Sequence, residues 1–465
     1  RQRAIKIHAD GNPLVTFDLA TCGSIYGFNL GISEEVTESI LTGYLHQHGG
    51  QVNRSSRLVR LIPQTEAVLA EIECNGSRYT MEFQWVVGCD GVHSTTREQC
   101  GIRMEGHDIA TSWAVFGVTL KGWLETYEAI LSYLDTPAVI LTPLPKQRWR
   151  VYLRPTSQDS DLLADAAETL RVYAPATSFV DVENPTRFRC HTKVAAAFRA
   201  GRVLLAGDAA HICTPAEGHG MNCGLHDAFN LGWKLALVCQ GADPALLDSY
   251  EIERRPAADL VAQSGDNAER NLTMIDPVQR AGRNQSIRDM FAEEKARHRE
   301  ILAETELNVD YSGSPIVFGN CDDGIAAGDQ LPDTILVQTS GERRCRLVEL
   351  TQRPSHTLLL LAGPSANAPE LLELDIALQQ LVAASRLFEA AFTLATESDL
   401  PASIGQIGHI EAALLDVKAI TLLAVRPDGY IGLRSDKNHL NALEHYQSLI
   451  LQGPRAIATI TGRPS

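Results

Sequence analysis

One stretch of the sequence restricts the fold more than any other: an apolar strand ends in Gly-Asp and is followed, after a loop, by a long helix. The strand is expected at 203–206, the dipeptide is Gly207-Asp208, and the helix is expected at 222–240. The helix carries apolar residues at helical spacing, which are Leu225, Phe229, Leu231, Leu235 and Val238. A uniformly apolar strand is typical of a parallel sheet covered on both faces. Open α/β sheets bind ligands at the carboxyl ends of such strands, where Asp208 stands.

A second strand end carries another Asp-Gly pair. The apolar run at 85–88 leads into Asp90-Gly91, with Ser94 and Arg97 just beyond. A carboxylate at such a turn can hold a ribose hydroxyl, a glycine lets the backbone approach a phosphate, and an arginine supplies positive charge. The alternative is an ordinary turn in which Ser94 caps the following helix.

The glycines after Asp208 do not form a dinucleotide-binding loop. Gly218, Gly220 and Gly224 have one residue too many in the last interval, and they do not directly follow their strand. Near 220–222 the expected helix would instead point its free N–H groups and positive dipole end at a ligand. His211 and His219, which flank the loop, are more often structural than catalytic in such a setting. The cysteines form no Cys-x-x-Cys pair or His/Cys cluster, so no metal site is expected.

Charge and length exclude several classes of protein. The net charge of −16 disfavours binding to nucleic acid and to anionic membranes. No apolar run approaches the roughly 18 residues that span a bilayer, and we expect a cytoplasmic protein. A chain of 465 residues exceeds one ordinary domain, so two or three are expected.

The rest of the chain alternates between strand-rich and helical regions. A strand at 15–19, a helix at 34–48 and a strand meander at 57–88 come first. Strands at 113–120, 139–144 and 149–153 with one helix at 162–173 predict a mostly antiparallel sheet. Residues 245–309 are expected to be helical, and 328–465 to form a separate α/β unit. That unit has strands near 356–361 and 420–425 and a hairpin at Pro427-Asp428-Gly429.

Two further segments complete a resemblance. These are Leu-Leu-Asp-Ser-Tyr-Glu-Ile-Glu-Arg-Arg-Pro at 246–256 and Val-Arg-Pro-Asp-Gly-Tyr at 425–430. With the two aspartate motifs, in this order, the sequence resembles the flavoprotein aromatic hydroxylases of the p-hydroxybenzoate hydroxylase family, in particular the phenol and polyketide hydroxylase branch. The resemblance implies an α/β fold: an FAD-binding Rossmann-like domain of the glutathione-reductase type, interleaved with a mostly antiparallel β substrate domain, and a C-terminal thioredoxin-like domain without redox cysteines. The implied domains are 31–105 with 196–265 (FAD), 1–30 with 106–195 (substrate), 266–325 (helical connection) and 326–465 (thioredoxin-like).

The same resemblance assigns site residues. The implied cofactor-binding residues are Asp90, Gly91, Arg97, Gly207, Asp208, Pro215, Gly218, Gly220, Met221 and Asn222. Asp208 would bind the ribityl chain, 220–222 would present N–H groups to the pyrimidine end of the flavin, and Asp90 with Arg97 would lie near the pyrophosphate and the nicotinamide approach. The implied catalytic residues are Pro215, Arg150 and His211. Pro215 would line the flavin near the substrate, and Arg150 would match a sheet arginine that faces it.

The resemblance further implies an NAD(P)H- and FAD-dependent monooxygenase that hydroxylates a small phenolic substrate with O2 through a flavin C4a-hydroperoxide. A homodimer is implied as well. Two alternatives stay open: a flavin oxidoreductase or epoxidase of the same fold, and a flavin-free binding protein. The general base also stays open among four residues, which are His211, His219, Tyr133 and Tyr152.

Two departures from the family pattern are visible. The chain contains no Gly-x-Gly-x-x-Gly element, and we expect that a segment carrying it precedes Arg1. Glu34 and Glu35 stand where a glutamine usually precedes the helix, and an acidic side chain there would be unfavourable beside a pyrophosphate.

Overall fold

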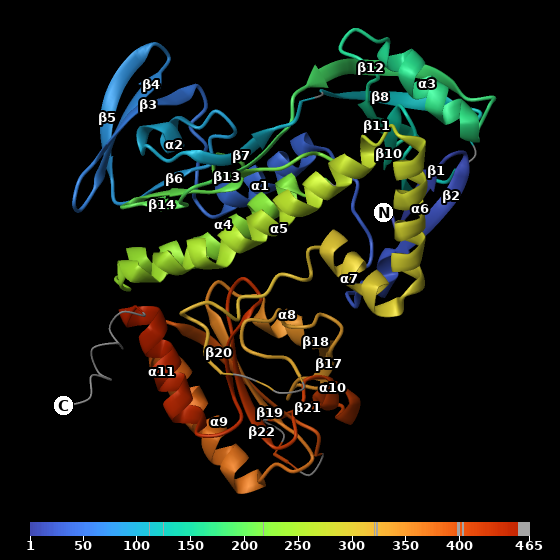
Figure 1. Cartoon of the computed structure of the whole chain (residues 1–465). Helices are drawn as coiled ribbons and strands as arrows, with labels where there is room; N and C mark the ends of the chain where they lie inside the picture. Colours follow the sequence, from blue (N-terminus) through green and yellow to red (C-terminus); the bar gives the residue numbers. More distant parts are fainter. Residues whose placement is uncertain are drawn as a thin grey trace, which may run out of the picture. The chain divides into compact units, whose positions relative to one another are not determined.

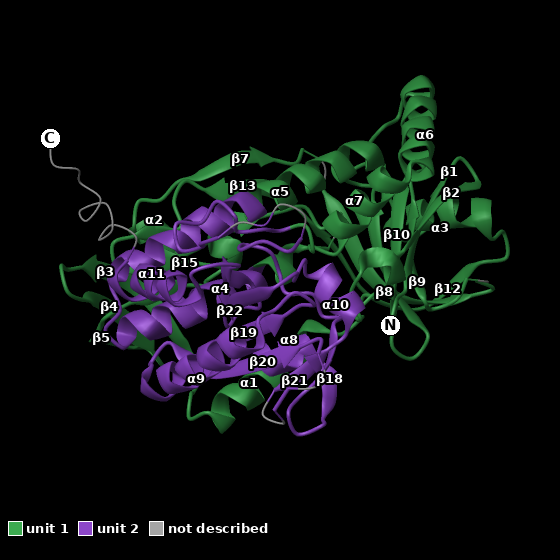
Figure 2. Ribbon diagram, turned by 90° about the horizontal axis from the view of Figure 1, so that it is seen from below, with its two compact units in different colours: residues 1–223, 258–308 green, residues 224–257, 309–465 purple. Residues whose placement is uncertain are grey.

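The computed structural model describes residues 1–453 except 111, 124, 217, 320, 322–323, 398–399 and 402–403. The chain divides into two compact units (Figure 2). The first unit is Arg1–Cys223 with Ala258–Asn308, and the second is Gly224–Ala257 with Val309–Ser465. The division falls inside helices α4 (Gly220–Cys239) and α5 (Asp248–Leu272). It therefore differs from the boundaries expected from sequence, which place α4 and most of α5 in one FAD-binding domain.

The largest sheet of the first unit has seven strands in the order β12-β8-β11-β10-β9-β1-β2. The strands are β1 (Ala4–Ala9), β2 (Asn12–Asp18), β8 (Trp113–Lys121), β9 (Ala129–Tyr133), β10 (Ala138–Leu144), β11 (Arg148–Arg154) and β12 (Ser178–Phe188). All neighbours are antiparallel except β1 and β9. The predicted antiparallel sheet and its three central strands are confirmed.

Helices cover both faces of this sheet (Figure 1). Helix α3 (Leu162–Tyr173) buries Ala166 and Leu170 against one face. Helix α6 (Pro277–Ala292) buries Ile287 and Phe291 against the other face, and after a break at Glu293 it is followed by α7 (Glu294–Glu304). Side chains alternate along a strand, so successive residues of β11 face α3 and α6 in turn.

Three smaller sheets complete the first unit. They are β14 (Arg199–Ala200), β15 (Val203–Leu205) and β6 (Val86–Gly88); β3 (Ser56–Pro63), β4 (Val68–Cys74) and β5 (Ser77–Phe83); and β16 (His211–Ile212), β13 (His191–Ala195) and β7 (Met104–Asp108). The meander predicted at 57–88 is confirmed as β3 to β6. The buried strand predicted at 203–206 is β15, whose three residues are all buried.

Helix α1 (Glu34–Gln47) confirms the helix predicted at 34–48, but it contains no buried residue. The apolar residues that gave the helical spacing, Val36, Ile40, Leu41 and Tyr44, are 48–62% exposed. Periodicity identifies the apolar face of a helix but not what covers it.

The second unit contains a mixed seven-stranded sheet in the order β18-β17-β21-β20-β19-β22-β23. Its elements are β17 (Leu336–Gln338), β18 (Arg344–Arg346), α8 (Leu347–Thr351), β19 (His356–Ala362), α9 (Ala368–Ala384), β20 (Phe388–Ala395), β21 (Gly405–Ile407), α10 (His409–Leu414), β22 (Ile420–Val425), β23 (Ile431–Ser435) and α11 (His439–Gln452). Strands β19, β20 and β21 are parallel, whereas β22 and β23 are antiparallel to their neighbours. The predicted strands and hairpin are confirmed, and Gly429 of the turn has φ 84°.

No helix in the described ranges combines the length and the apolar character that crossing a membrane requires.

Candidate functional site

The two aspartate motifs lie at the same edge of one small sheet. Strands β6 and β15 are parallel neighbours, with Val86 opposite Val203 and Gly88 opposite Leu205. Asp90 follows the end of β6, and Asp208 follows the end of β15. Because carboxyl ends of parallel strands meet at one edge, two motifs far apart in sequence come together where α/β sheets bind ligands.

Asp90 holds the start of α2 (Thr95–Gln99). Its carboxylate accepts hydrogen bonds from the Ser94 hydroxyl (2.5 Å) and from the Thr96 amide and hydroxyl (2.9 and 3.0 Å). Burial alone would raise the pKa of Asp90, but these hydrogen bonds outweigh it and lower the pKa. Ser94 caps α2 by accepting from the Arg97 amide at 2.9 Å, so the alternative reading of Ser94 is confirmed. Gly91, at φ 78°, makes the turn between the two.

Arg97 links the two motifs. It is 7% exposed, and its guanidinium donates to the carbonyl oxygens of Val92 (2.9 Å) and Ala209 (3.1 Å). Ala209 lies directly after Asp208, so Arg97 fixes the second motif against the first. A role for Arg97 or Asp90 in binding cofactor stays a prediction.

Asp208 has a different environment. It lies in a single turn of 3-10 helix, Gly207–Ala209, that begins at Gly207 with φ 58°. Burial raises the pKa of the Asp208 carboxyl, and the nearby His211 opposes the shift. Within the described residues, no donor or cation contacts this carboxylate. A partly desolvated acid without a partner at a strand end suits two hydroxyl groups of a ligand, and in this respect the site fits the ribityl chain of a flavin.

The loop after Asp208 leads to the N-terminus of α4. Gly218 precedes this helix with φ 78°, and Met221 and Asn222 in its first turn are exposed. The first-turn N–H groups of a 20-residue helix carry partial positive charge, which stabilises an anionic group. His211 of β16 is 4% exposed, and its Nε2 lies 3.8 Å from Sγ of Cys223 in the first turn of α4.

The loop also meets the large sheet. Ala216, next to Pro215, packs in the same apolar cluster as Tyr152 of β11, Ile140 of β10 and Phe291 of α6. Two of the implied catalytic residues, Pro215 of this loop and Arg150 of β11, thus lie on segments that the fold brings together.

Arg150 and Tyr152 lie on the α6 face of β11, since Trp149, Val151 and Leu153 pack on the α3 face. Arg150 is exposed and lies opposite Thr142 and Gly117 on the neighbouring strands. Burial raises the pKa of Tyr152; Arg150 opposes this shift, and Glu34 at the start of α1 adds to it. The raised pKa favours the protonated form of Tyr152, whose hydroxyl can then donate a hydrogen bond.

Two other candidates for the general base are Tyr133 and His219, and both are buried. Tyr133 is 1% exposed and packs on the α3 face, where its ring stacks on His8 at 4.9 Å. Burial raises its pKa. His219 is 6% exposed, with Nε2 4.0 Å from a carboxylate oxygen of Glu304, and burial lowers its pKa.

Sequence reasoning missed a buried ion pair beside the same apolar cluster. Arg154 of β11 pairs with Glu269 of α5, and Nε1 of Trp113 donates to Glu269 at 3.0 Å. The two charged residues are 7% and 8% exposed. Nothing in the local sequence of either residue indicates the pair, because it joins segments more than 100 positions apart.

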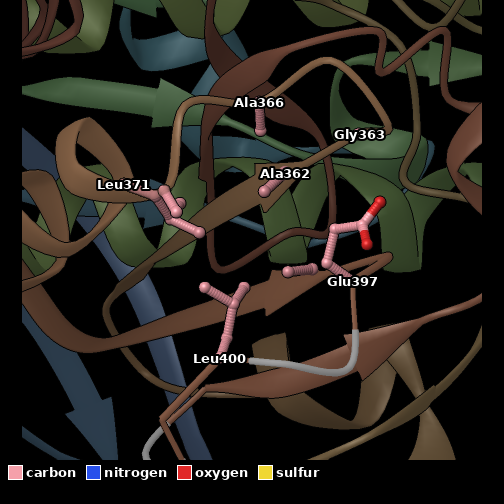
Figure 3. A pocket seen from close by; sticks show the side chains of 8 residues that line it. Ala362, Gly363, Ala366, Leu371, Glu397 and Leu400 are labelled. Atoms are coloured by element: carbon pink, nitrogen blue, oxygen red, sulfur yellow. The ribbon is translucent and has the colours of Figure 1, made fainter.

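A separate cavity of about 200 Å³ lies in the second unit, where β19 and β20 end and α9 begins (Figure 3). Its lining is Ala362, Gly363, Ala366, Ala368, Leu371, Ala395, Glu397 and Leu400. These residues include no thiol, imidazole or hydroxyl group, and the only ionisable side chain among them is that of Glu397. We take the edge at Asp208, where the two aspartate motifs meet, as the candidate site.

The sequence profile described as FAD binding domain matches residues 19–264, just over half of the chain. Among curated proteins, 6-methylpretetramide 4-monooxygenase of Streptomyces rimosus is 30% identical over 335 residues, which are 68% of this chain and 59% of that protein. The chain thus spans less than two thirds of that relative. Pentachlorophenol 4-monooxygenase of Sphingobium chlorophenolicum is 30% identical over 381 residues, which are 78% of this chain and 67% of that protein.

Solved structures agree with these sequence matches. The flavin-dependent monooxygenase PieE, in complex with FAD and substrate, has a TM-score of 0.73 at 19% identity. The superposition covers 97% of this chain and 87% of the PieE chain. The anhydrotetracycline hydroxylase OxyS from Streptomyces rimosus has a TM-score of 0.69 at 25% identity, covering 95% of this chain and 83% of its own.

Proposed function

Since the chain belongs to the FAD-binding family of flavoprotein aromatic-ring monooxygenases, we propose that it hydroxylates a phenolic ring with NAD(P)H and O2, using FAD. The observation that carries the proposal is Asp208, an unpartnered and partly desolvated carboxylate at the shared edge of β6 and β15. Bound FAD would supply the redox chemistry, because it can accept a hydride from NAD(P)H and then activate O2.

The residues of this chain have distinct parts in the proposal. Asp208 would hold the ribityl chain, and the first turn of α4 would stabilise negative charge on the reduced flavin. Asp90 and Arg97 would hold the loops that follow β6 and β15 in fixed positions. Arg97 would also lie near the pyrophosphate of the cofactor. Pro215 and Ala216 would close the site against the sheet and exclude water.

Tyr152 and Arg150 would orient the substrate. Both lie on the α6 face of β11, and the raised pKa of Tyr152 keeps its hydroxyl protonated. Such a hydroxyl donates to a phenolate oxygen, while the guanidinium of Arg150 favours the ionised form of the phenol. His211, which lowers the pKa of Asp208, would favour the ionised form of the carboxylate that binds the flavin.

The names of the relatives support a substrate class. Those relatives are named for 6-methylpretetramide and for pentachlorophenol. We therefore expect a phenol, either a single substituted ring or a fused aromatic system.

We further propose that residues 326–465 form a thioredoxin-like domain. Support comes from the parallel pair β19 and β20 joined by α9, followed by the antiparallel β22 and β23 and then by α11. A homodimer is proposed from the resemblance alone, and sedimentation velocity tests it.

The test is a visible spectrum of the purified protein, expressed together with any sequence that precedes Arg1, after FAD is added, followed by NADH and NADPH oxidation with and without phenols. The panel would contain pentachlorophenol, simple phenols and a fused aromatic polyketide. Oxidation that accelerates with one phenol and incorporates a single ¹⁸O atom from ¹⁸O2 supports hydroxylation. An epoxide product would support the epoxidase alternative, and a chain that takes up no FAD would leave the flavin-free binding protein.

A further inference from the structure

The cavity of the second unit has no part in the proposed chemistry. Its floor consists of small residues at the carboxyl ends of two parallel strands: Ala362 ends β19 and Ala395 ends β20, and they are 2% and 1% exposed. Leu371 of α9, which is 1% exposed, lines one side. Because methyl groups stand where larger side chains would fill the space, a hollow of about 200 Å³ is left. The carboxyl ends of parallel strands are also where α/β sheets usually bind ligands.

Close backbone packing closes the cavity on one side, and the opposite side is open. Gly363, directly after β19, lies so near the chain before β22 that a Cβ on it would come within 2.2 Å of the carbonyl oxygen of Val417. Its amide also donates to the carbonyl oxygen of Ala419 at 2.7 Å. Ala366 and Ala368, in contrast, are partly exposed and fully exposed. A ligand therefore has a way in past these two alanines.

The two ends of the cavity differ in chemistry (Figure 3). Leu371 and Leu400 lie at one end, and the carboxylate of Glu397 lies at the other. Glu397 is exposed, and no cation or hydrogen-bond donor among the described residues contacts its carboxylate. A carboxylate that water reaches can attract a cation without the desolvation cost of a buried charge. The cavity thus offers an apolar end and an anionic end.

The first turn of α9 does not make this a site for anions. The N-terminus of a helix generally attracts negative charge. In α9, however, the side chain of Asn367 already accepts from the amide of Glu370 at 3.1 Å, and Pro369 has no N–H. Glu370 also places its own negative charge in this turn. Together with Glu397 at the mouth, this charge favours a cation.

The size of the cavity limits the ligand to one ring or a short chain. A cavity of about 150 Å³ lined by apolar side chains holds benzene, and this one is slightly larger. Each methylene group that such a cavity removes from water strengthens binding by roughly fourfold. The ligand that suits both ends has an apolar body and a single positive charge.

We propose that this cavity binds a small primary amine, with one aliphatic or aromatic ring at Leu371 and Leu400 and its ammonium group at Glu397. The site consists of residues of the second unit alone, so the inference depends neither on FAD nor on hydroxylation. It gives the C-terminal α/β unit a ligand of its own, distinct from the phenol of the proposed reaction.

The experiment is a titration of the full protein, expressed with any sequence that precedes Arg1. The probes are cyclohexylamine, cyclohexanol and cyclohexanecarboxylate, which share one ring and differ chiefly in the charge of their polar group. The alanine methyl groups carry ¹³C, so the methyls of Ala366 and Ala395 report binding in the cavity itself. The methyl of Ala424, which is 0% exposed in β22 and does not line the cavity, is the reference.

Three variants separate charge from shape. Glu397→Gln removes the charge at the mouth, and Ala368→Leu places a larger side chain in the open side. The matched control is Glu370→Gln, which removes the same charge from a residue outside the lining. All three positions are exposed, so the variants should fold like the wild-type protein.

We expect cyclohexylamine to shift the Ala366 and Ala395 methyl signals with a Kd on the order of 1 mM. Cyclohexanol should bind roughly threefold to fivefold more weakly, and the carboxylate more weakly still. Glu397→Gln should make the amine and the alcohol bind equally, whereas Glu370→Gln should keep their difference. Ala368→Leu should abolish binding of both.

Three results would overturn the inference. The first is that no probe shifts the methyls of Ala366 and Ala395 more than that of Ala424. The second is that the alcohol or the carboxylate binds wild type as tightly as the amine does. The third is that Glu370→Gln removes the preference for the amine as fully as Glu397→Gln. None of them bears on hydroxylation, which the flavin measurements test separately.

Discussion

Asp90 and Asp208 are both aspartates that follow a parallel strand, yet their pKa values move in opposite directions. Both are partly desolvated, which alone would raise the pKa of either carboxyl. The hydrogen bonds from Ser94 and Thr96 reverse the shift for Asp90, whereas Asp208 has only the charge of His211 nearby. Asp90 is therefore satisfied within the protein, whereas no donor among the described residues contacts the carboxylate of Asp208, whose binding of a ligand stays a prediction.

Replacing Asp208 by alanine should weaken FAD binding by roughly 10- to 100-fold, since a hydrogen bond to a charged group contributes about 1.5–3 kcal/mol. Asp208→Asn, which keeps an acceptor but loses the charge, should fall between this variant and wild type. Fluorescence titration of FAD measures the change. The matched control is Asp159→Asn, at an exposed aspartate of the first unit. Equal affinities for the Asp208→Ala and Asp159→Asn chains would contradict the assignment.

At the scale of elements, the ion pair of Arg154 and Glu269 joins helix α5 to the large sheet. Arg154 belongs to β11, and Trp113 of β8 donates to the same carboxylate. Gly265 of α5 lies close to the loop before α4, since a side chain on it would come within 2.7 Å of Thr214. The pair thus keeps α5 at the distance that both the sheet and the loop require.

Replacing Glu269 by leucine leaves the Arg154 charge buried without its partner, so we expect unfolding to become easier by about 3–5 kcal/mol. The double change Arg154→Met with Glu269→Leu should recover most of this loss because no charge stays buried. Denaturant unfolding of the single and double variants measures both. As a comparison, Glu183→Gln breaks a more exposed ion pair between β12 and Arg148, which lies on β11 like Arg154. This variant should lose less than about 1 kcal/mol of unfolding free energy. A double variant no more stable than Glu269→Leu would refute the assigned cause.

At the scale of the whole molecule, a buried histidine makes the second unit sensitive to acid. Burial, and to a smaller extent the charge of Arg426, lowers the pKa of His356 to about 3. Its ring is 1% exposed and packs edge-on against Trp233 at 5.0 Å. Because the folded state binds this proton less readily than the unfolded chain, the contribution of His356 to stability is complete above pH 6.5 and decreases as the pH falls toward 3.

Between pH 7 and pH 5 the wild-type chain should therefore lose about 2 kcal/mol of unfolding free energy through His356 alone. His356→Phe keeps an aromatic ring in the site and removes the titration, so its stability should change less over the same range. Denaturant unfolding at the two pH values tests this. His356→Phe and wild type with the same pH dependence would show that another group controls the acid response.

Much of the fold was predictable because its signals are local. The strands β8, β10, β11 and β15 and the helices α3 and α4 follow from alternation or helical spacing of apolar residues, which neighbouring positions determine. The hairpin at 427–429 follows from its turn chemistry. For the site, the Gly-Asp pairs, the loop glycines and the start of α4 were visible as motifs.

The sequence by itself thus determined the elements, the two strand-end motifs and, through resemblance, the family. Only the tertiary structure decided which aspartate accepts hydrogen bonds from its neighbours, that Arg97 donates to backbone carbonyls, and that Arg154 pairs with Glu269. It also decided that the apolar face of α1 is exposed and that Arg426 and Glu253 join α4 and α5 to the C-terminal segment. The reason is physical: periodicity and turns depend on neighbours in sequence, whereas burial, pKa and ion pairing depend on which distant segments the fold brings together.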